Sequence, residues 1–319
     1  MTQSNKRVVV QEVGLRDGLQ SLSQVMATDA KKRWITAAYE AGIRHIEVAS
    51  FVPPKLLPQM ADAAEVVAHA VTLPDLVVTA LVPNLKGAEN ALKAGAHRIV
   101  APISVSEKHS LANVRKTPDA MIEEFARIRH LRDSESAWRN VTLIGGLSTV
   151  FGCTFQGYVL ESDVVRIALA TIEAGADVVA LGDTTGHATP AHVGRLLDQL
   201  LPVAQGKVTS LHFHDTRGLA LANTVVALEH SIREFDASLA GIGGCPNAPG
   251  ATGNVATEDL VYMLHSMGYE TGIDIASLLE IRDTLTDALP QAPLYGYIAR
   301  EGIFSGSVPT QLSARGAQS

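Results

Sequence analysis

Ala174-Gly175-Ala176-Asp177-Val178-Val179-Ala180-Leu181-Gly182-Asp183 joins the end of one predicted helix to the strand that follows it. Glycine directly after a helix is a common C-terminal cap, and the apolar, valine-rich run after it is typical of a buried strand. The same Ala-Gly pair recurs at residues 41–42 and 94–95, each followed within a few residues by a β-rich run. The chain therefore alternates helices with buried strands, as parallel α/β folds do.

Eight strand–helix pairs of this kind follow one another along the chain. We expect strands at residues 7–13, 44–50, 76–82, 97–103, 141–150, 177–181, 208–214 and 235–239. We expect the helix after each strand at residues 29–40, 61–70, 86–93, 118–131, 162–173, 190–201, 220–230 and 258–267. Eight pairs are what a (β/α)8 TIM barrel requires. A doubly wound open sheet is the alternative, but no Gly-x-Gly-x-x-Gly phosphate loop follows Val13.

We divide the chain into two parts. Residues 1–272 are predicted to form the barrel, which is the catalytic domain. Residues 273–319 are predicted to be an appended C-terminal segment, with a further helix at 275–288 and then a tail rich in Pro, Tyr and Gly.

Composition excludes several classes of protein. The 319 residues carry a net charge of −7, and no basic stretch is long enough to follow a nucleic-acid backbone. The apolar runs are far shorter than a membrane span requires. Two cysteines make no disulfide framework, and the polar start of the chain lacks a signal-peptide pattern. We therefore expect a cytoplasmic protein without nucleic-acid or membrane partners.

Two histidines stand at the end of the seventh predicted strand. Because side chains at i and i+2 of a strand point to the same side, His212 and His214 present their imidazoles together. Asp17 follows the first strand, and Asn254 lies in the loop after the eighth. In a TIM barrel the C-terminal ends of all strands share one face. Imidazole, carboxylate and amide oxygen together favour Mg²⁺ or Mn²⁺ over structural zinc.

Further polar residues fall at the same predicted face, and each also has an interpretation without function. Glu47 could be a charge in the barrel core that pairs with an arginine, and Asp183 could be a turn residue. Asp17 and Gln20 could cap a helix, and Cys245 could be a small buried residue rather than an acid or base on a mobile loop. Their coincidence on one face with two strand histidines favours a catalytic site.

The motifs at these positions resemble those of the 3-hydroxy-3-methylglutaryl-CoA lyase family, from about Val8 to Gly272. The runs that carry the resemblance are Arg16-Asp17-Gly18-Leu19-Gln20, Phe51-Val52-Pro53-Pro54-Lys55, Pro83-Asn84-Leu85-Lys86-Gly87, Gly182-Asp183-Thr184, His212-x-His214-Asp215-Thr216, Ala240-Gly-x-Gly-Gly-Cys245-Pro246 and Gly253-Asn254-x-Ala256-Thr257-Glu258-Asp259-Leu260.

The resemblance implies a retro-Claisen lyase that acts on an acyl-CoA in leucine degradation, as a homodimer. The implied ligands of Mg²⁺ or Mn²⁺ are Asp17, His212, His214 and Asn254. The implied catalytic residues are Arg16, which would stabilise the enolate oxygen, Cys245 as loop acid/base, and Glu47 and Asp183 in support. Substrate contacts are implied for Arg16, Gln20 and Ser50.

The chain departs from the family around the substrate. Leu15 stands where the family commonly has Pro, and Ser21-Leu22-Ser23 replaces Asn-Glu-Lys. The other departures are Val48, Ala49, Ile144, Gly146 and Asn247. Citramalyl-CoA, which would give pyruvate and acetyl-CoA, is therefore an alternative substrate.

Two other classes compete with a lyase. A Claisen-type synthase would share the metal set, but the Leu19-Gln20 form of the first motif is lyase-like. An inert barrel is disfavoured by the intact ligand positions.

Overall fold

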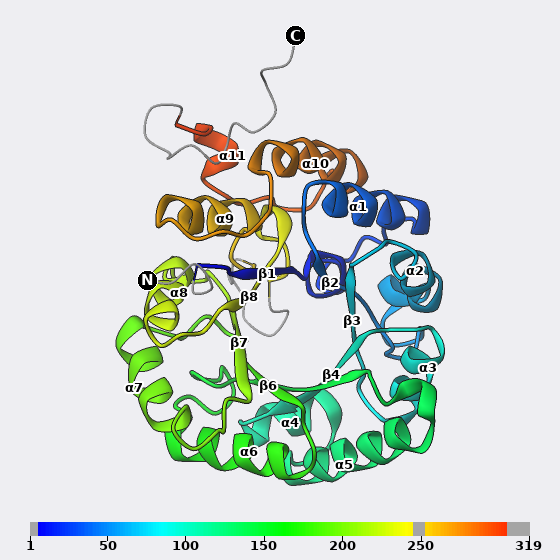
Figure 1. Ribbon diagram of the computed structural model, residues 1–319, viewed down its shortest axis with the longest axis vertical. Helices are drawn as coiled ribbons and strands as arrows, with labels where there is room; N and C mark the ends of the chain where they lie inside the picture. The colour runs from blue at the N-terminus through cyan, green and yellow to red at the C-terminus, as the bar shows by residue number, and fades with distance from the viewer. Residues whose placement is uncertain (1–5, 245–252, 305–319) are drawn as a thin grey trace.

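The computed structural model describes residues 6–244 and 253–304. Eight parallel strands close into a barrel in chain order, with β8 paired to β1 (Figure 1). The strands are β1 (Val9–Glu12), β2 (His45–Ser50), β3 (Val77–Leu81), β4 (Arg98–Ser104), β5 (Thr142–Ser148), β6 (Val178–Asp183), β7 (Val208–Phe213) and β8 (Glu234–Ala237). The predicted TIM barrel is confirmed.

Helices surround the barrel, and every helix expected from the sequence is present (Figure 1). They are α1 (Thr28–Glu40), α2 (Ala63–Ala70), α3 (Leu85–Lys93), α4 (Glu107–Val114), α5 (Pro118–Ser134), α6 (Glu161–Glu173), α7 (Pro190–Leu200), α8 (Ala220–Glu229), α9 (Thr257–Ser266), α10 (Ile275–Ala288) and α11 (Ile298–Glu301). Short helical turns lie at η2 (Gly14–Gly18), η3 (Pro58–Met60), η4 (Ser136–Trp138) and η5 (Leu239–Gly241). The sequence did not predict α4, α11 or these turns.

The glycine of each Ala-Gly pair has the backbone conformation of a helix C-cap. Gly42, Gly95 and Gly175 follow α1, α3 and α6 with φ of 101°, 89° and 103°. These values lie in the region that favours glycine, so each join can end a helix and turn the chain back into the next strand. At Gly42 a Cβ would also lie 2.1 Å from the carbonyl oxygen of Gly272.

The barrel interior carries polar side chains near the start of the strands. At the start of the strands, Arg98 donates to Glu234 at 2.6 Å and lies 3.2 Å from His45 Nδ1. Burial, helped by Arg98, lowers the pKa of His45 to about 4. Outside the barrel, residues such as Ile46 and Leu211 are fully buried against the helices. The buried charge of Arg98 is therefore paired, as a buried charge must be.

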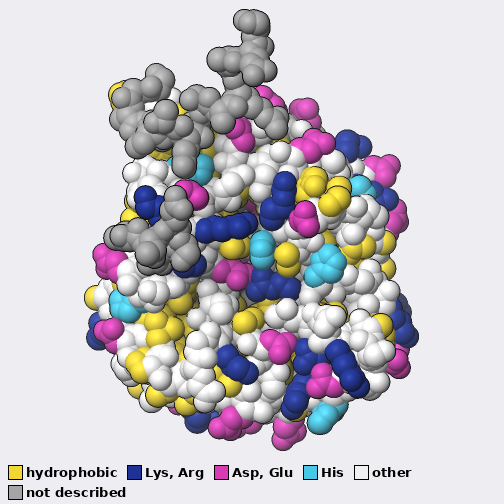
Figure 2. All heavy atoms as spheres, viewed as in Figure 1, with side chains coloured by type: hydrophobic (Ala, Val, Ile, Leu, Met, Phe, Trp, Pro, Cys, Tyr) yellow, Lys and Arg dark blue, Asp and Glu magenta, His cyan; other side chains and the backbone are white. Residues whose placement is uncertain are grey.

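The C-terminal helices lie against one side of the barrel. Figure 1 shows α10 and α11 beside α9, and α10 also contacts α1. Among the described residues, none of the helices combines the length and apolar character that crossing a bilayer requires. In the described part of the face drawn in Figure 2, acidic and basic side chains are interspersed rather than gathered into one basic tract.

Candidate active site

A single turn of π-helix after β1 places two charged residues at the mouth of the barrel. The backbone N–H groups of Arg16, Asp17 and Gly18 all point to the carbonyl of Val13, which tightens the chain as the strand ends. A Cβ at Gly14 would lie 2.5 Å from Glu12 Oε1, and one at Gly18 would lie 2.6 Å from Ile242. The glycines of this turn therefore let it pack closely against the end of β8.

The predicted metal ligands meet at this turn. Asp17 Oδ2 lies 3.9 Å from His212 Nε2 and 3.7 Å from His214 Nε2. One ligand atom from each of the three residues lies within 4.8 Å of the others. The two imidazole rings are 5.0 Å apart between centroids, as expected for neighbours on one side of β7. Such a spacing lets all three side chains reach a single divalent cation.

The two histidines are held differently: the carboxylates of Asp236 and Asp17 raise the pKa of His212 against the effect of burial, and Asp236 also fixes its ring. The Nδ1 atom of His212 lies 3.0 Å from Asp236 Oδ2, which leaves Nε2 facing Asp17. Gln11 in turn donates to Asp236 Oδ1 at 2.8 Å. Burial lowers the pKa of His214 to about 4, so this ring is neutral near pH 7. An acceptor behind a ligating histidine fixes its ring and raises its basicity.

Asn254 completes the set from the β8–α9 connection. Its amide nitrogen donates to Asp17 Oδ2 at 2.8 Å and to the carbonyl of Ile242 at 3.0 Å. Its Oδ1 is buried and has no hydrogen-bond partner among the described residues. Gly243, with φ of 114°, lies so close that a Cβ would be 2.4 Å from Asn254 Nδ2. A buried acceptor without a donor beside an acidic ligand fits a cation.

Electrostatics keep Asp17 ionised although most of its side chain is shielded from solvent. Burial alone would raise the pKa of this carboxyl, but Arg16, His212 and His214 together hold it at about 2. Arg16 Nη1 lies 2.5 Å from Asp17 Oδ1. Gln20 Nε2 approaches the same oxygen at 3.5 Å. The residues present thus supply a permanent negative charge at the centre of the proposed ligand set.

Arg16 also reaches across to β2. Its Nη2 atom lies 2.6 Å from Glu47 Oε2, and both residues are buried. Burial raises the pKa of Glu47, while Arg16 opposes the shift. Two buried atoms of this pair, Arg16 Nε and Glu47 Oε1, have no hydrogen-bond partner among the described residues. The pair therefore offers a free donor and a free acceptor beside the predicted metal ligands.

Asp183 is buried at the end of β6. Its carboxylate accepts from the backbone N–H of His187 at 2.8 Å and of Ala188 at 3.1 Å, which shapes the loop before α7. Burial raises the pKa of Asp183 to about 6, against the effect of these donors and of His212. The turn interpretation of this residue matches its contacts, and its catalytic role stays a prediction.

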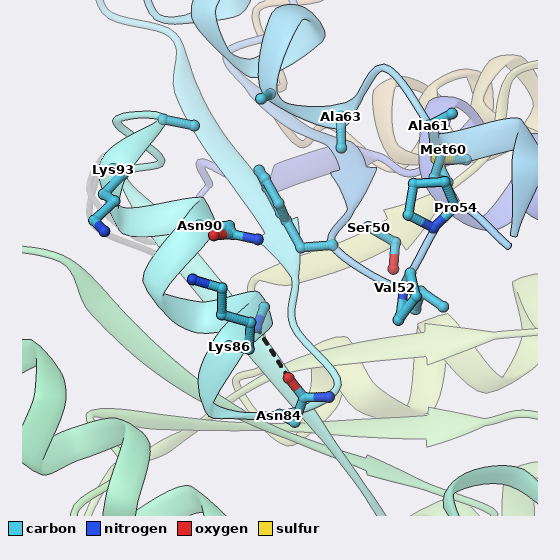
Figure 3. Close-up of a pocket in the computed structure, with 15 residues that line it drawn as sticks. Ser50, Val52, Pro54, Met60, Ala61, Ala63, Asn84, Lys86, Asn90 and Lys93 are labelled. Atoms are coloured by element: carbon cyan, nitrogen blue, oxygen red, sulfur yellow. Dashed lines mark hydrogen bonds between the residues drawn. The ribbon is translucent and has the colours of Figure 1, made fainter. Parts of the chain in front are cut away.

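A pocket of about 620 Å³ opens between the β2–α2 connection and α3. Figure 3 shows Ser50, Val52 and Pro54 from the β2–α2 connection on one side and α3 with the residue before it on the other. Asn84 caps α3 by accepting from the N–H of Gly87 at 3.0 Å. Ser50 is fully buried at the end of β2, three residues after Glu47, and its hydroxyl has no partner among the described residues. Ser50 therefore lines the pocket from the end of β2, the strand that also carries Glu47.

The departures from the family pattern lie mostly in packed positions. Leu15, Val48, Ala49 and Ile144 are buried. At Gly146 a Cβ would lie 2.7 Å from Val100 Cγ1, so Val100 occupies the room that a side chain on β5 would need. Cys245 and Asn247 lie outside the described residues.

The sequence reasoning missed Asp236 and Glu12. Asp236 orients His212, and the alternation of polar and apolar residues in Glu234-Phe235-Asp236-Ala237-Ser238 could have indicated that it faces inward. Glu12 accepts from the N–H of Leu239 at 2.9 Å and from the Thr257 hydroxyl at 2.6 Å, and so ties β1 to the β8–α9 connection. The sequence could have indicated Glu12, because it is a charged residue at the end of a valine-rich strand.

Glu12 predicts a pH dependence of stability. Burial raises the pKa of this carboxyl from 4.5 to about 7, so the folded protein holds a proton that the unfolded chain has lost across this window. Stability from this group therefore falls as pH rises. We expect the free energy of unfolding of the wild type, relative to Glu12→Gln, to fall by about 2 kcal/mol between about pH 5 and about pH 8. Urea unfolding measures it, and a pH-independent difference would contradict it.

Comparison with known proteins agrees with this geometry. The chain is 42% identical over 274 residues to the hydroxymethylglutaryl-CoA lyase YngG of Bacillus subtilis, covering 86% of this chain and 90% of that protein. It is 40% identical over 277 residues to the hydroxymethylglutaryl-CoA lyase of Pseudomonas mevalonii, covering 86% and 90%. A structure of an HMG-CoA lyase from Acinetobacter baumannii, in complex with coenzyme A and 3-methylmalate, superposes with a TM-score of 0.89 at 37% identity, covering 97% and 99%.

A family model described as HMGL-like matches residues 7–285, which include the whole barrel and most of α10. Together with the closed barrel and the Asp17–His212–His214 cluster at its mouth, these similarities identify the chain as a member of the HMGL-like family.

Proposed function

We propose that the protein is a divalent-metal-dependent carbon–carbon lyase that cleaves 3-hydroxy-3-methylglutaryl-CoA to acetyl-CoA and acetoacetate. The observation that carries the proposal is the meeting of Asp17, His212, His214 and Asn254 beside Arg16. In the reaction the C3 hydroxyl loses its proton and the C2–C3 bond breaks. The bonding electrons pass to C2, giving the enolate of acetyl-CoA, which then takes up a proton.

The four residues that meet at the barrel mouth would hold Mg²⁺ or Mn²⁺. A divalent ion there would lower the free energy needed to deprotonate a substrate hydroxyl. Asp17 brings negative charge, and the neutral His214 and the Asn254 oxygen add lone pairs without further charge. The unpartnered Oδ1 of Asn254 supports this set, because a buried acceptor is costly to leave unsatisfied.

We assign to Arg16 the stabilisation of the enolate oxygen. Its two Nη atoms are held by Asp17 and Glu47, so the guanidinium cannot swing away, and its Nε–H remains available. A fixed donor aimed at developing negative charge is a large source of catalysis. Glu47 would hold Arg16, while Asp183 would support the neighbouring loop. Cys245 is proposed as the acid that protonates the enolate carbon.

The pocket between the β2–α2 connection and α3 is proposed to take part of the coenzyme A arm. Its walls are mainly apolar, with Lys86 and Lys93 along α3 (Figure 3). Both lysines pair with Glu89, at 2.8 Å and 2.5 Å, in exposed contacts that cost little to open. Ser50 in the pocket wall would contact the thioester, and Gln20, two residues after η2, would contact the acyl group.

Gly243 tests the proposed ligand set without removing a ligand. Gly243→Ala would place a Cβ 2.4 Å from Asn254 Nδ2 and 3.2 Å from Asp17 Oδ2, at a φ of 114°. We expect Mn²⁺ affinity, followed by the electron paramagnetic resonance of free Mn²⁺, to fall about tenfold or more. Gly206→Ala is the control, since it shares a positive φ but meets no atom within 4 Å. Equal Mn²⁺ affinity of the two variants would contradict the proposed set.

The substrate is tested by offering several thioesters in the presence of Mg²⁺. We expect acetoacetate from 3-hydroxy-3-methylglutaryl-CoA at a higher kcat/KM than pyruvate from citramalyl-CoA. Absence of acetoacetate would contradict the proposal. A higher kcat/KM for release of pyruvate from citramalyl-CoA would favour the alternative substrate. Condensation of acetyl-CoA with a 2-oxo acid as the main activity would favour a synthase instead. A division of the chain at residue 272, a homodimer, a cytoplasmic location and a role in leucine degradation remain proposals.

A further inference from the structure

The β8–α9 connection carries Gly243 and Asn254, yet part of its backbone is held in an unfavourable conformation. Ala240 has φ of 59° and ψ of 16°, in the left-handed region that costs a residue with a Cβ about 1 kcal/mol or more. Gly241 follows with φ of 62°. Such a conformation persists only where the surroundings impose it, so the contacts of Ala240 show what shapes the connection.

Both backbone groups of Ala240 are held from outside the barrel. Its N–H donates to Glu258 Oε2 at 3.1 Å. Its carbonyl accepts from the N–H of Tyr295 at 2.8 Å. Gly241 lies against the same segment, because a Cβ there would be 3.1 Å from Tyr295 Cβ. The strained turn is therefore fixed by the start of α9 and by the C-terminal segment.

Arg282 joins these two supports. Its Nη1 lies 2.5 Å from Glu258 Oε1 and donates to the carbonyl of Tyr295 at 2.5 Å. Glu258 is fully buried, so without Arg282 its charge would lack a partner. One residue along, Asp259 accepts from the N–H groups of Tyr297 at 2.8 Å and Ile298 at 2.8 Å. We call Arg282 and residues 295–298 the C-terminal clasp.

The clasp reaches the metal ligands through the backbone. Ile242, two residues after Ala240, accepts from the Asn254 amide at 3.0 Å, and Asn254 donates to Asp17. Gly253, in the part of the connection before α9, lies against the Gly241 carbonyl, because a Cβ at Gly253 would be 1.8 Å from that oxygen. A shift at Ala240–Gly241 would therefore move Asn254 relative to Asp17.

We propose that the C-terminal clasp is a positioning device for the active site, in which Arg282, through Glu258 and Tyr295, fixes the turn at Ala240 and thereby the place of Asn254. This inference rests on the proposed metal site. It assigns a catalytic purpose to a part of the chain that lies outside the barrel. Arg282 is a positioning residue, since its contacts are with Glu258 and Tyr295.

The test compares Mn²⁺ affinity and amide exchange in the full-length protein. We expect Arg282→Ala to raise the Mn²⁺ Kd about tenfold, the low end of the range for residues behind a metal ligand. Deuterium uptake in peptides covering residues 238–244 should also quicken. Arg282→Lys should restore both, because one ammonium group can reach the Glu258 carboxylate and the Tyr295 carbonyl.

Arg132→Ala is the matched control. Arg132 is buried, pairs with Asp177 at 3.0 Å and donates to the carbonyl of Val141 at 2.8 Å, but it lies on α5. It should lower stability without changing the Mn²⁺ Kd. Gly296→Ala is a second route, because a Cβ there would lie 2.9 Å from Glu258 Oε1 at a φ of 110°. We expect it to weaken Mn²⁺ binding as Arg282→Ala does, and it takes the place of Arg282→Ala if that variant does not fold.

The outcomes separate the clasp from the metal site. Wild-type Mn²⁺ affinity and exchange in both Arg282→Ala and Gly296→Ala would overturn the clasp and leave the proposed function standing. A wild-type protein that binds no Mn²⁺ would overturn the metal site and with it the catalytic purpose of the clasp. Equal weakening of Mn²⁺ binding by Arg132→Ala would overturn the specific role of Arg282.

Discussion

Asp17→Asn is expected to abolish metal binding while leaving the barrel folded. Asp17 is the carboxylate of the cluster, and its pKa of about 2 means that it is ionised throughout the working range of pH. Asparagine has nearly the same shape but removes the charge that compensates a divalent cation. We expect Mn²⁺ affinity to fall by more than about 100-fold, beyond the effect of residues behind the ligands. Acetyl-CoA release should fall with it.

The measurement combines Mn²⁺ titration with thermal unfolding. Asp119→Asn is the control, because Asp119 pairs with Arg166 at 3.0 Å on the exposed surface and lies in α5. Metal should raise the melting temperature of the wild type and of Asp119→Asn, since a ligand that binds only the folded state stabilises it. An Asp17→Asn protein that is stabilised by Mn²⁺ as the wild type is would show that the metal lies elsewhere.

Arg16→Gln is expected to slow catalysis in a different way, without loss of the metal. It takes away the fixed donor proposed for the enolate oxygen, and loss of one such donor typically lowers kcat by about 100- to 1000-fold. It also leaves Glu47, which is 2% exposed, without its cation. Removing one partner of a buried ion pair costs about 3–5 kcal/mol of stability. Mn²⁺ should still bind, because Arg16 is not a ligand.

A double variant separates the two effects. In Arg16→Gln with Glu47→Gln the buried carboxylate is gone, so most of the lost stability should return. The enolate donor is still missing, so kcat should stay low. Steady-state kinetics and urea unfolding of both single variants and the double variant provide the comparison. Recovery of kcat in the double variant would mean that Arg16 serves only to neutralise Glu47.

Local spacing was enough to predict the barrel and the histidine pair. Gly42, Gly95 and Gly175 each end a helix, and this depends only on the residues next to them. The two-residue period of a strand places His212 and His214 on the same side, whatever the rest of the barrel does. The rule that strand ends share one face then brought Asp17 and Asn254 to the same place.

Contacts between residues far apart in sequence could not be predicted in this way. Glu47 had two interpretations, a core ion pair or a site residue. The structure shows that its partner is Arg16, which matches the ion pair, while its catalytic role stays a prediction. The clasp of Arg282 on Glu258 depends on how the C-terminal segment folds back onto α9. The helix α4 is short and follows a strand end directly, which gave its helical period little length in which to show.

The most direct test measures acetyl-CoA released from 3-hydroxy-3-methylglutaryl-CoA by the chelator-stripped protein, before and after Mg²⁺ or Mn²⁺ is returned. If Asp17, His212, His214 and Asn254 hold the metal on which cleavage depends, the stripped protein releases no acetyl-CoA above background and regains full activity when metal is added. Undiminished release by the stripped protein, or none after metal is restored, would contradict a metal-dependent lyase at this site.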